Sequence, residues 1–206
     1  MSMVPARPFL MRGLLAAAVM TAGACSTAPE KSTAATLDVA ANAAAANAAA
    51  AHNHAGPPVA ATPGHFRVAE QVREKLAAFE DINAAKAAGY SVQFPAGCAE
   101  TEAGAQGFHY LNESLVDNKT EVMRPELVMY EPQADGSMQL IGVDYIIPFD
   151  QWKSPQAPML LGVPMARNEP LKVWALHIWA QRANPSGLFA PWNPTASCQF
   201  KDAVTP

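Results

Sequence analysis

The sequence predicts an α+β domain in which one long N-terminal helix packs on a mainly antiparallel β-sheet. Two observations lead to this class. Apolar residues recur every three or four positions over residues 66–88, which is the period of an amphipathic helix. Apolar runs with the composition of strands then follow one another, separated by turn-forming residues. A helical segment followed by a series of strands favours an α+β arrangement over alternating strands and helices.

The predicted helix carries its large apolar residues on one stripe, and most of its charged residues lie off that stripe. The stripe consists of Val68, Val72, Leu76, Phe79 and Ile82. Pro63 suits the start of such a helix, and Gly89 suits the position just past its end. These signals predict one continuous helix that ends at Ala88.

The clearest strand signal is a hairpin. Residues 127–131 and 138–147 are apolar runs that flank residues 132–136, which contain the turn-forming pair Asp-Gly. Residues 171–180 form a third long run with apolar side chains at both alternating sets of positions. This pattern predicts a central strand that is covered on both faces.

The other predicted elements are shorter. Strands are expected at residues 91–94 and 108–111, with a Gly- and Ala-rich loop at residues 98–107 between them. The tail at residues 184–198 is rich in Pro, Asn and Trp, so it is expected to be an ordered loop.

Residues 1–24 have the features of an export signal. Arg7 and Arg12 are positive, residues 14–20 are apolar, and residues 22–24 are the small residues that a signal peptidase needs. The apolar stretch is too short for a permanent transmembrane helix.

Cys25 follows this segment directly, and Ala-Gly-Ala-Cys resembles the lipobox at which bacterial lipoproteins are cleaved and acylated. Ala22 stands where Leu is usual, so simple secretion after cleavage by ordinary signal peptidase is the alternative. Ser26 rather than Asp follows the cysteine, which by resemblance to sorted lipoproteins indicates the outer membrane. We therefore expect a protein of the cell envelope, attached to the membrane through an N-terminal lipid.

Two segments are expected in the mature chain. Residues 25–64 contain mostly Ala, Asn, Pro, Thr and Ser, so they cannot bury enough apolar surface to fold and are predicted to be a disordered tether. Residues 65–206 are predicted to be a single globular domain. The whole chain has 14 basic and 18 acidic residues without a basic cluster, so no nucleic-acid partner is expected.

The chain has three cysteines. If Cys25 carries lipid, Cys98 and Cys198 remain as a pair for a disulfide in an oxidising compartment. Two unpaired cysteines are the alternative.

Several short motifs resemble a family of exported bacterial and fungal proteins for which no activity is established. The resemblance covers residues 69–198. Its motifs are Gly107-Phe108-His109-Tyr110, Arg124-Pro125-Glu126, Tyr130-Glu131, Leu176-His177-Ile178-Trp179, and residues 184–194 ahead of Cys198. The resemblance implies a single exported domain and no particular chemistry.

Four polar residues lie in apolar strand settings. They are His109, Glu131, Asp144 and His177. A buried imidazole or carboxylate needs a hydrogen-bond partner or a metal. Two histidines with Glu131 or Asp144 would be the minimal ligand set for a divalent zinc or iron ion. The alternatives are a purely structural role, in which each histidine bonds a local carbonyl or acid, and contact with an organic ligand.

Arg124 and Asp144 are also candidates for ligand binding. Arg124 could clamp an anion, or it could pair with a nearby acid. Nucleophile motifs and phosphate-binding glycine loops are absent from the sequence, which disfavours covalent hydrolysis and nucleotide cofactors. The leading expectation is an envelope lipoprotein domain with a ligand-binding or structural role, and the runner-up is a metal-binding protein or metalloenzyme.

Overall fold

The computed structural model of the protein describes residues 59–204. Cys25, the predicted export signal and most of the predicted tether lie outside these residues. The described elements, in chain order, are α2 (Pro63–Lys75), η1 (Ala77–Glu80), α3 (Ile82–Ala87), β1 (Val92–Thr101), β2 (Gly104–Leu111), η2 (Glu113–Leu115), β3 (Leu127–Pro132), β4 (Met138–Pro148), β5 (Met159–Leu160), β6 (Val163–Pro164), β7 (Ala166–Asn168), β8 (Val173–Ile178) and η3 (Lys201–Ala203).

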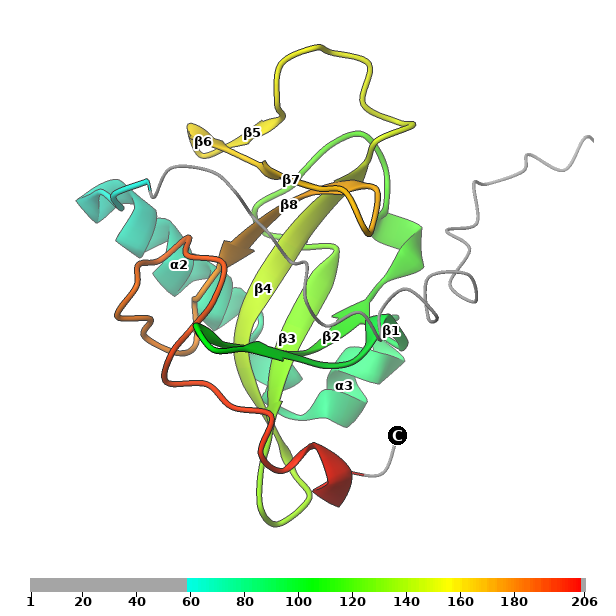
Figure 1. The fold of residues 1–206 in the computed structure, drawn as a ribbon, viewed down its shortest axis with the longest axis vertical. Coiled ribbons are helices and arrows are strands. Elements are labelled where there is room, and N and C mark those ends of the chain that lie inside the picture. The colour runs from blue at the N-terminus through cyan, green and yellow to red at the C-terminus, as the bar shows by residue number, and fades with distance from the viewer. Residues whose placement is uncertain (1–58, 205–206) are drawn as a thin grey trace, which may run out of the picture. The chain divides into compact units, whose positions relative to one another are not determined.

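A six-stranded sheet organises the described part of the chain. Its strand order is β1-β2-β3-β4-β8-β7, and all neighbouring pairs are antiparallel. The sheet curves into a half-barrel, with β1 crossing at a steep angle to β4 and β8 (Figure 1). Strands β5 and β6 form a separate small pair.

The predicted long helix at residues 66–88 is wrong, and so is the α+β class that depended on it. The fold is mainly antiparallel sheet, and the helical segment is divided into α2, the 3-10 turn η1 and the short helix α3. Leu76 ends α2, and the Asp81 side chain caps the start of α3 by accepting from the Asn83 backbone N–H at 2.9 Å. The apolar stripe continues through the break, which is why the sequence period did not show it.

A tertiary contact accounts for part of the break. In an unbroken helix the Phe79 carbonyl would accept from the N–H of residue 83. Here Asp81 takes that N–H, and the Tyr130 hydroxyl donates to the Phe79 carbonyl at 2.6 Å. The side chain of a strand residue therefore replaces a helix hydrogen bond, an effect that no local pattern predicts.

The predicted hairpin is confirmed as β3 and β4, joined by a turn with Gly136 at a positive φ of 80°. The third predicted strand is β8, which has β4 on one side and β7 on the other. The predicted loop at residues 98–107 is wrong, because β1 continues to Thr101 and pairs with β2 from Gly104 onward.

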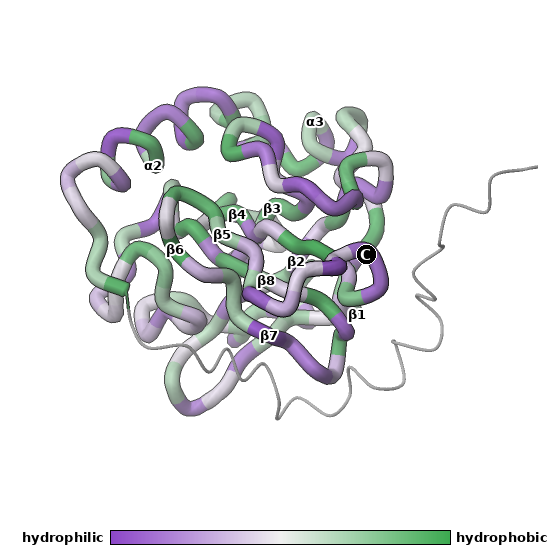
Figure 2. The backbone as a smooth tube through the Cα atoms, turned by 90° about the horizontal axis from the view of Figure 1, so that it is seen from above, coloured by the Kyte–Doolittle hydropathy of each residue, from purple (hydrophilic) through white to green (hydrophobic). Residues whose placement is uncertain are grey.

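The sheet has two apolar faces. One face carries the largest buried cluster and is covered by the helical segments (Figure 2). We call the other the inner face, and it carries two smaller clusters. One inner cluster is built around Phe94, Leu111, Leu127, Ile146 and Val173, and the other around Ala105, Met129, Ile141, Trp179 and Ala196.

The predicted disulfide between Cys98 and Cys198 is confirmed, with the two Cα atoms 5.9 Å apart. It ties the C-terminal tail to β1. The tail also pairs with β2, since Ala105 and Asn193 exchange two backbone hydrogen bonds of 3.1 Å. These contacts hold Ala196 and Cys198 against the inner face.

Within residues 59–204, no helix has the length and apolarity needed to cross a membrane.

Candidate metal centre

Three polar side chains meet on the inner face between its two apolar clusters. They are His109 of β2, Asp144 of β4 and His177 of β8, and one ligand atom from each lies within 4.8 Å of the others. All three are buried, with exposed fractions of 2%, 6% and 2%. The structure therefore brings both predicted histidines to one point and supplies Asp144 as their carboxylate.

Strand register explains the meeting. Asp144 lies directly opposite His177 in the β4–β8 pair and opposite Leu127 in the β3–β4 pair. Directly opposed residues project from the same face of a sheet. His109 lies opposite Met129, two residues along β3 from Leu127, so it projects from that face too. His109 thus reaches the other two side chains across β3.

The three side chains lie close enough together to form one cluster. His177 Nε2 lies 3.5 Å from Asp144 Oδ2. The ring centroids of His109 and His177 are 5.6 Å apart, with 48° between the ring planes. The Trp179 ring lies 6.1 Å from the His177 ring, so the cluster is bounded by an aromatic side chain on that side.

A small cavity of about 10 Å³ lies at this cluster. Most of its lining is apolar, including Phe94, Ile146 and Val173. A space of this size holds about one water-sized or ion-sized occupant. A cavity of this size does not hold an organic substrate.

Gln106 also lines this cavity, and sequence reasoning missed it. Its side-chain amide is fully buried, and Nε2 donates to the Pro191 carbonyl at 2.8 Å. In the part of the chain that the structure describes, no donor reaches the Oε1 atom. A buried acceptor left unpaired costs about 1 to 3 kcal/mol, so this atom marks a place where a ligand would be stabilising.

A bulge in β2 gives Gln106 this direction. Ala99 pairs with Gly107 and Glu100 pairs with Ala105, which leaves Gln106 as an extra residue. Gly107 adopts a φ of +79°, and a Cβ there would lie 2.2 Å from the Tyr130 carbonyl oxygen. Bulges of this kind turn a side chain out of the normal alternation of a strand. The only signal in the sequence is the pair of glycines that flank Ala105 and Gln106.

Glu131, predicted as an alternative carboxylate ligand, does not join the cluster. Its Oε1 accepts from the Ser197 backbone N–H at 2.8 Å, and its Oε2 pairs with Arg182. Gln133 donates to Oε2 as well, at 3.1 Å. Glu131 therefore holds the C-terminal tail, and its oxygens are already used.

Arg124, predicted either as a clamp for an anionic ligand or as the partner of a nearby acid, pairs with Glu121. The two side chains are more than half exposed, and Arg124 Nη1 lies 3.3 Å from Glu121 Oε2. Binding of an anion by Arg124 stays a prediction.

Glu126 is a second residue whose importance the sequence did not show. It is 2% exposed, and its Oε2 accepts from the Ile146 backbone N–H at 3.2 Å. Burial raises the pKa of this carboxyl from 4.5 to about 8, against the opposing effect of its backbone hydrogen bonds. The negative charge of Asp144 raises it further.

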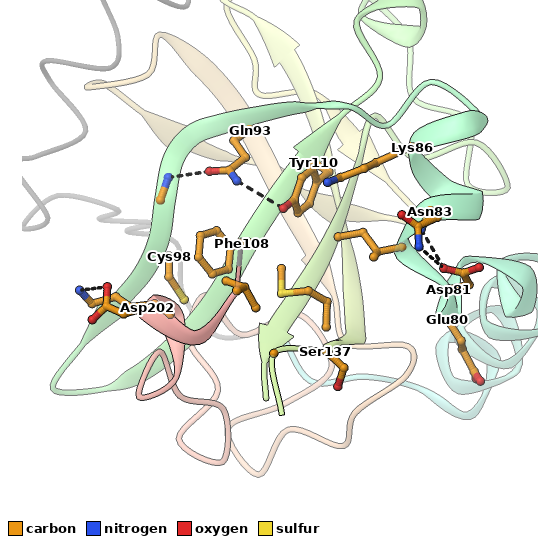
Figure 3. A pocket seen from close by; sticks show the side chains of 16 residues that line it. Glu80, Asp81, Asn83, Lys86, Gln93, Cys98, Phe108, Tyr110, Ser137 and Asp202 are labelled. Carbon is orange, nitrogen blue, oxygen red and sulfur yellow. Dashed lines mark hydrogen bonds and ion pairs between the residues drawn. The ribbon is translucent and has the colours of Figure 1, made fainter. Parts of the chain in front are cut away.

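A larger cavity of about 640 Å³ lies between α3, β1, the β3–β4 turn and the C-terminal η3 (Figure 3). Phe108 and Met138 supply apolar lining. Tyr110 accepts a hydrogen bond from Gln93 Nε2 at 3.3 Å, and the Lys86 ammonium lies 5.4 Å from the centre of the Tyr110 ring. This cavity is separate from the histidine cluster, since no residue lines both.

Comparisons of the chain with family models, with curated proteins and with solved structures give no match.

Proposed function

We propose that this protein is an exported domain that binds one divalent transition-metal ion through His109, Asp144 and His177. The observation that carries the proposal is the convergence of three buried ligand atoms within 4.8 Å. Ligand atoms bound to one zinc ion at about 2.0 to 2.2 Å lie about 3.3 Å apart. The three ligand atoms would therefore have to move together by up to about 1.5 Å to coordinate one ion.

The ligand types select the class of ion. Two imidazoles with one carboxylate suit zinc, iron and other first-row divalent ions, whereas calcium and magnesium prefer oxygen ligands throughout. The apolar lining of the cavity supports the same view. Burying a carboxylate there without a cation would cost more than burying it as part of a metal site.

Metal analysis of the purified full chain tests the proposal. The predicted tether contains the sequence His52-Asn53-His54, so both histidines should first be replaced by Gln to prevent them from binding metal. We expect one ion per chain after growth with added zinc or iron. His177→Gln or His109→Gln should reduce the ion content to background levels.

His65→Gln is the matched control. His65 lies at the third residue of α2, where it completes a capping box with Thr62, and Gln is suited to that position. His65 is not part of the cluster. Equal loss of metal in His65→Gln, or a metal-free protein under all supplements, would contradict the proposal.

The larger cavity supports a second candidate function, the binding of a small amphipathic molecule. Its volume falls within the range of about 300 to 1,000 Å³ that is typical of ligand pockets. Its lining combines the Phe108 and Tyr110 rings with the Lys86 ammonium, and three carboxylates also line the cavity. A flat apolar molecule with one anionic group would stack on the rings and place that group at Lys86.

Fluorescence titration with anilinonaphthalene sulfonate tests this second function. We expect saturable binding of one molecule per chain, weakened by Lys86→Met. Lys119→Met, which removes an exposed charge away from the cavity, should leave binding unchanged. Unsaturable binding, or an equal effect of the two variants, would rule out a specific site.

We also propose that the chain is a lipoprotein acylated on Cys25 and held at the outer membrane. The lipobox-like sequence at residues 22–25 and Ser26 support this proposal. Radioactive palmitate should label the wild-type chain and not Cys25→Ala, which should leave the membrane fraction. An unmodified peptide mass at the mature N-terminus would contradict the proposal.

A further inference from the structure

The Gln106 side chain has only one orientation that satisfies its known hydrogen bond. The Pro191 carbonyl can only accept, so the atom that bonds it at 2.8 Å must be the amide nitrogen. The amide oxygen is therefore the atom without a donor among the described residues. Its residue lines the same cavity as His109, Asp144 and His177.

The size of the cavity limits what else can bind an ion there. About 10 Å³ is room for one small occupant, and an ion placed among the three ligands would fill it. Zinc-like ions usually take four ligands in closed sites, and the other polar residues that line this small cavity are Gln106 and Asn168. Asn168 Oδ1 already accepts from the Leu171 backbone N–H at 3.1 Å, which favours Gln106 as the source of a fourth ligand.

We propose that Gln106 Oε1 is this fourth ligand, which makes the centre a closed site of two imidazoles, one carboxylate and one amide oxygen for a zinc-like divalent ion. The inference rests on the proposed metal function and specifies it further. Such a site binds its ion for stability and offers no open position for catalysis. The β2 bulge at Gln106 and Gly107 is the feature of the backbone that makes the fourth ligand available.

Two substitutions distinguish the effect of the Gln106 side-chain oxygen from the effect of its N–H donor. Gln106→Leu removes both the oxygen and the donor, while Gln106→Glu removes the donor and keeps an oxygen. If the oxygen binds the ion, Gln106→Leu should weaken zinc binding by roughly 10- to 100-fold, and Gln106→Glu should keep it within a few-fold of wild type. Competition with a chelator of known affinity measures both.

Cobalt(II) loaded into the full wild-type chain provides a readout that does not depend on the variants folding. A closed four-ligand site should give the strong visible absorption of tetrahedral cobalt, and added azide should leave the spectrum unchanged. Gln106→Ala should open a position, so azide should then shift the spectrum. The metal-free form of each variant should be compared with wild type by circular dichroism.

The outcomes distinguish this inference from the function on which it rests. If the wild-type chain binds neither zinc nor cobalt, the metal function itself fails. If it binds both but azide shifts the wild-type spectrum, the site is open and the role of Gln106 is overturned. Equal weakening by Gln106→Leu and Gln106→Glu would also overturn it, because it would assign the effect to the lost bond with Pro191.

Discussion

His177 and Asp144 lie directly opposite each other on neighbouring antiparallel strands, with Nε2 and Oδ2 3.5 Å apart and both side chains buried. The flanking residues Val143 and Ile178 project from the other face into the main core. A slip of one residue between the strands would exchange the two faces. The packing of the core therefore keeps this polar pair in register.

Asp144→Asn should remove the stabilisation that zinc gives to the folded chain. Asn keeps the shape of the side chain and one amide oxygen, but it removes the one negative charge in the proposed ligand set. At an ion concentration 100 times the Kd, bound zinc should stabilise the wild-type fold by about 2.7 kcal/mol. Thermal unfolding with and without zinc measures the difference.

Asp150→Asn is the control for that comparison, because Asp150 is exposed just beyond the end of the same strand. It should keep the full zinc-induced shift in Tm. A similar shift in Asp144→Asn would show that Asp144 is not a ligand.

Gly107→Ala should be severely destabilising. A Cβ at this position meets the Tyr130 carbonyl oxygen at 2.2 Å, and φ is +79°. Gly97→Ala provides the comparison, because Gly97 has φ +89° with nothing within 4 Å of its Cβ position. Backbone strain alone should cost Gly97→Ala about 1 kcal/mol, and the clash should make Gly107→Ala cost several kcal/mol.

Urea unfolding of the two alanine variants gives the free energies. Equal costs would mean that β2 relaxes away from Tyr130, and that the bulge does not depend on close contact between the strands. A Gly107→Ala protein that folds should also bind zinc roughly 10- to 100-fold more weakly, as Gln106→Leu does, because the bulge directs Gln106.

Glu126→Gln should change how stability depends on pH. The folded-state pKa is raised from 4.5 to about 8, so the folded chain keeps a proton between these values that the unfolded chain releases. Wild-type stability should therefore fall as pH rises from about 4.5 to about 8, by up to about 5 kcal/mol from this one group. The amide cannot ionise, so the variant should lack this loss.

The measurement is urea unfolding of both proteins at pH 5 and pH 9. The free energy of unfolding of the variant, relative to that of the wild type, should rise from pH 5 to pH 9. Glu113→Gln, at an exposed glutamate, should give no such gain. If Glu126→Gln is less stable than the wild type by the same amount at both pH values, the Glu126 carboxyl is ionised in the folded chain. The loss would then come from a weaker hydrogen bond with the Ile146 backbone N–H.

Loss of the disulfide should destabilise the fold without removing the metal ligands. Cys198→Ser should cost about 2 to 5 kcal/mol, because the unfolded chain is no longer constrained by a long closed loop. Cys98→Ser and the double variant should cost the same, since one bond is lost in each case. A double variant much less stable than either single variant would show that the thiols also contribute separately.

The sequence predicted the strands better than the helices, for a physical reason. The β3–β4 hairpin is specified by a local turn and by flanking apolar runs. The break between η1 and α3 depends in part on Tyr130, which is far away in the sequence and donates its hydroxyl to the Phe79 carbonyl. Helix periodicity records which side chains are buried, and it does not record where a carbonyl finds another donor.

The candidate site was predictable in part. His109, His177 and Asp144 stood out because each is a polar residue among apolar strand residues. Glu131 met the same criterion, but the C-terminal tail uses its oxygens, which depends on where Ser197 and Arg182 lie in the fold. Gln106 was missed because a bulge changes the face to which it points, and alternation assumes regular strands.

The three clustered ligands come from β2, β4 and β8, with β3 in between, and this arrangement determines when an ion can act. No two of these three ligands lie within 30 residues of each other, and the proposed fourth ligand, Gln106, adds only one neutral amide oxygen near His109, so an unfolded or partly paired chain has no strong chelating segment at these positions. An ion therefore cannot nucleate folding here, unlike in a zinc finger, where ligands a few residues apart gather early. It should leave the folding rate nearly unchanged and slow unfolding, since it binds only after the sheet has closed.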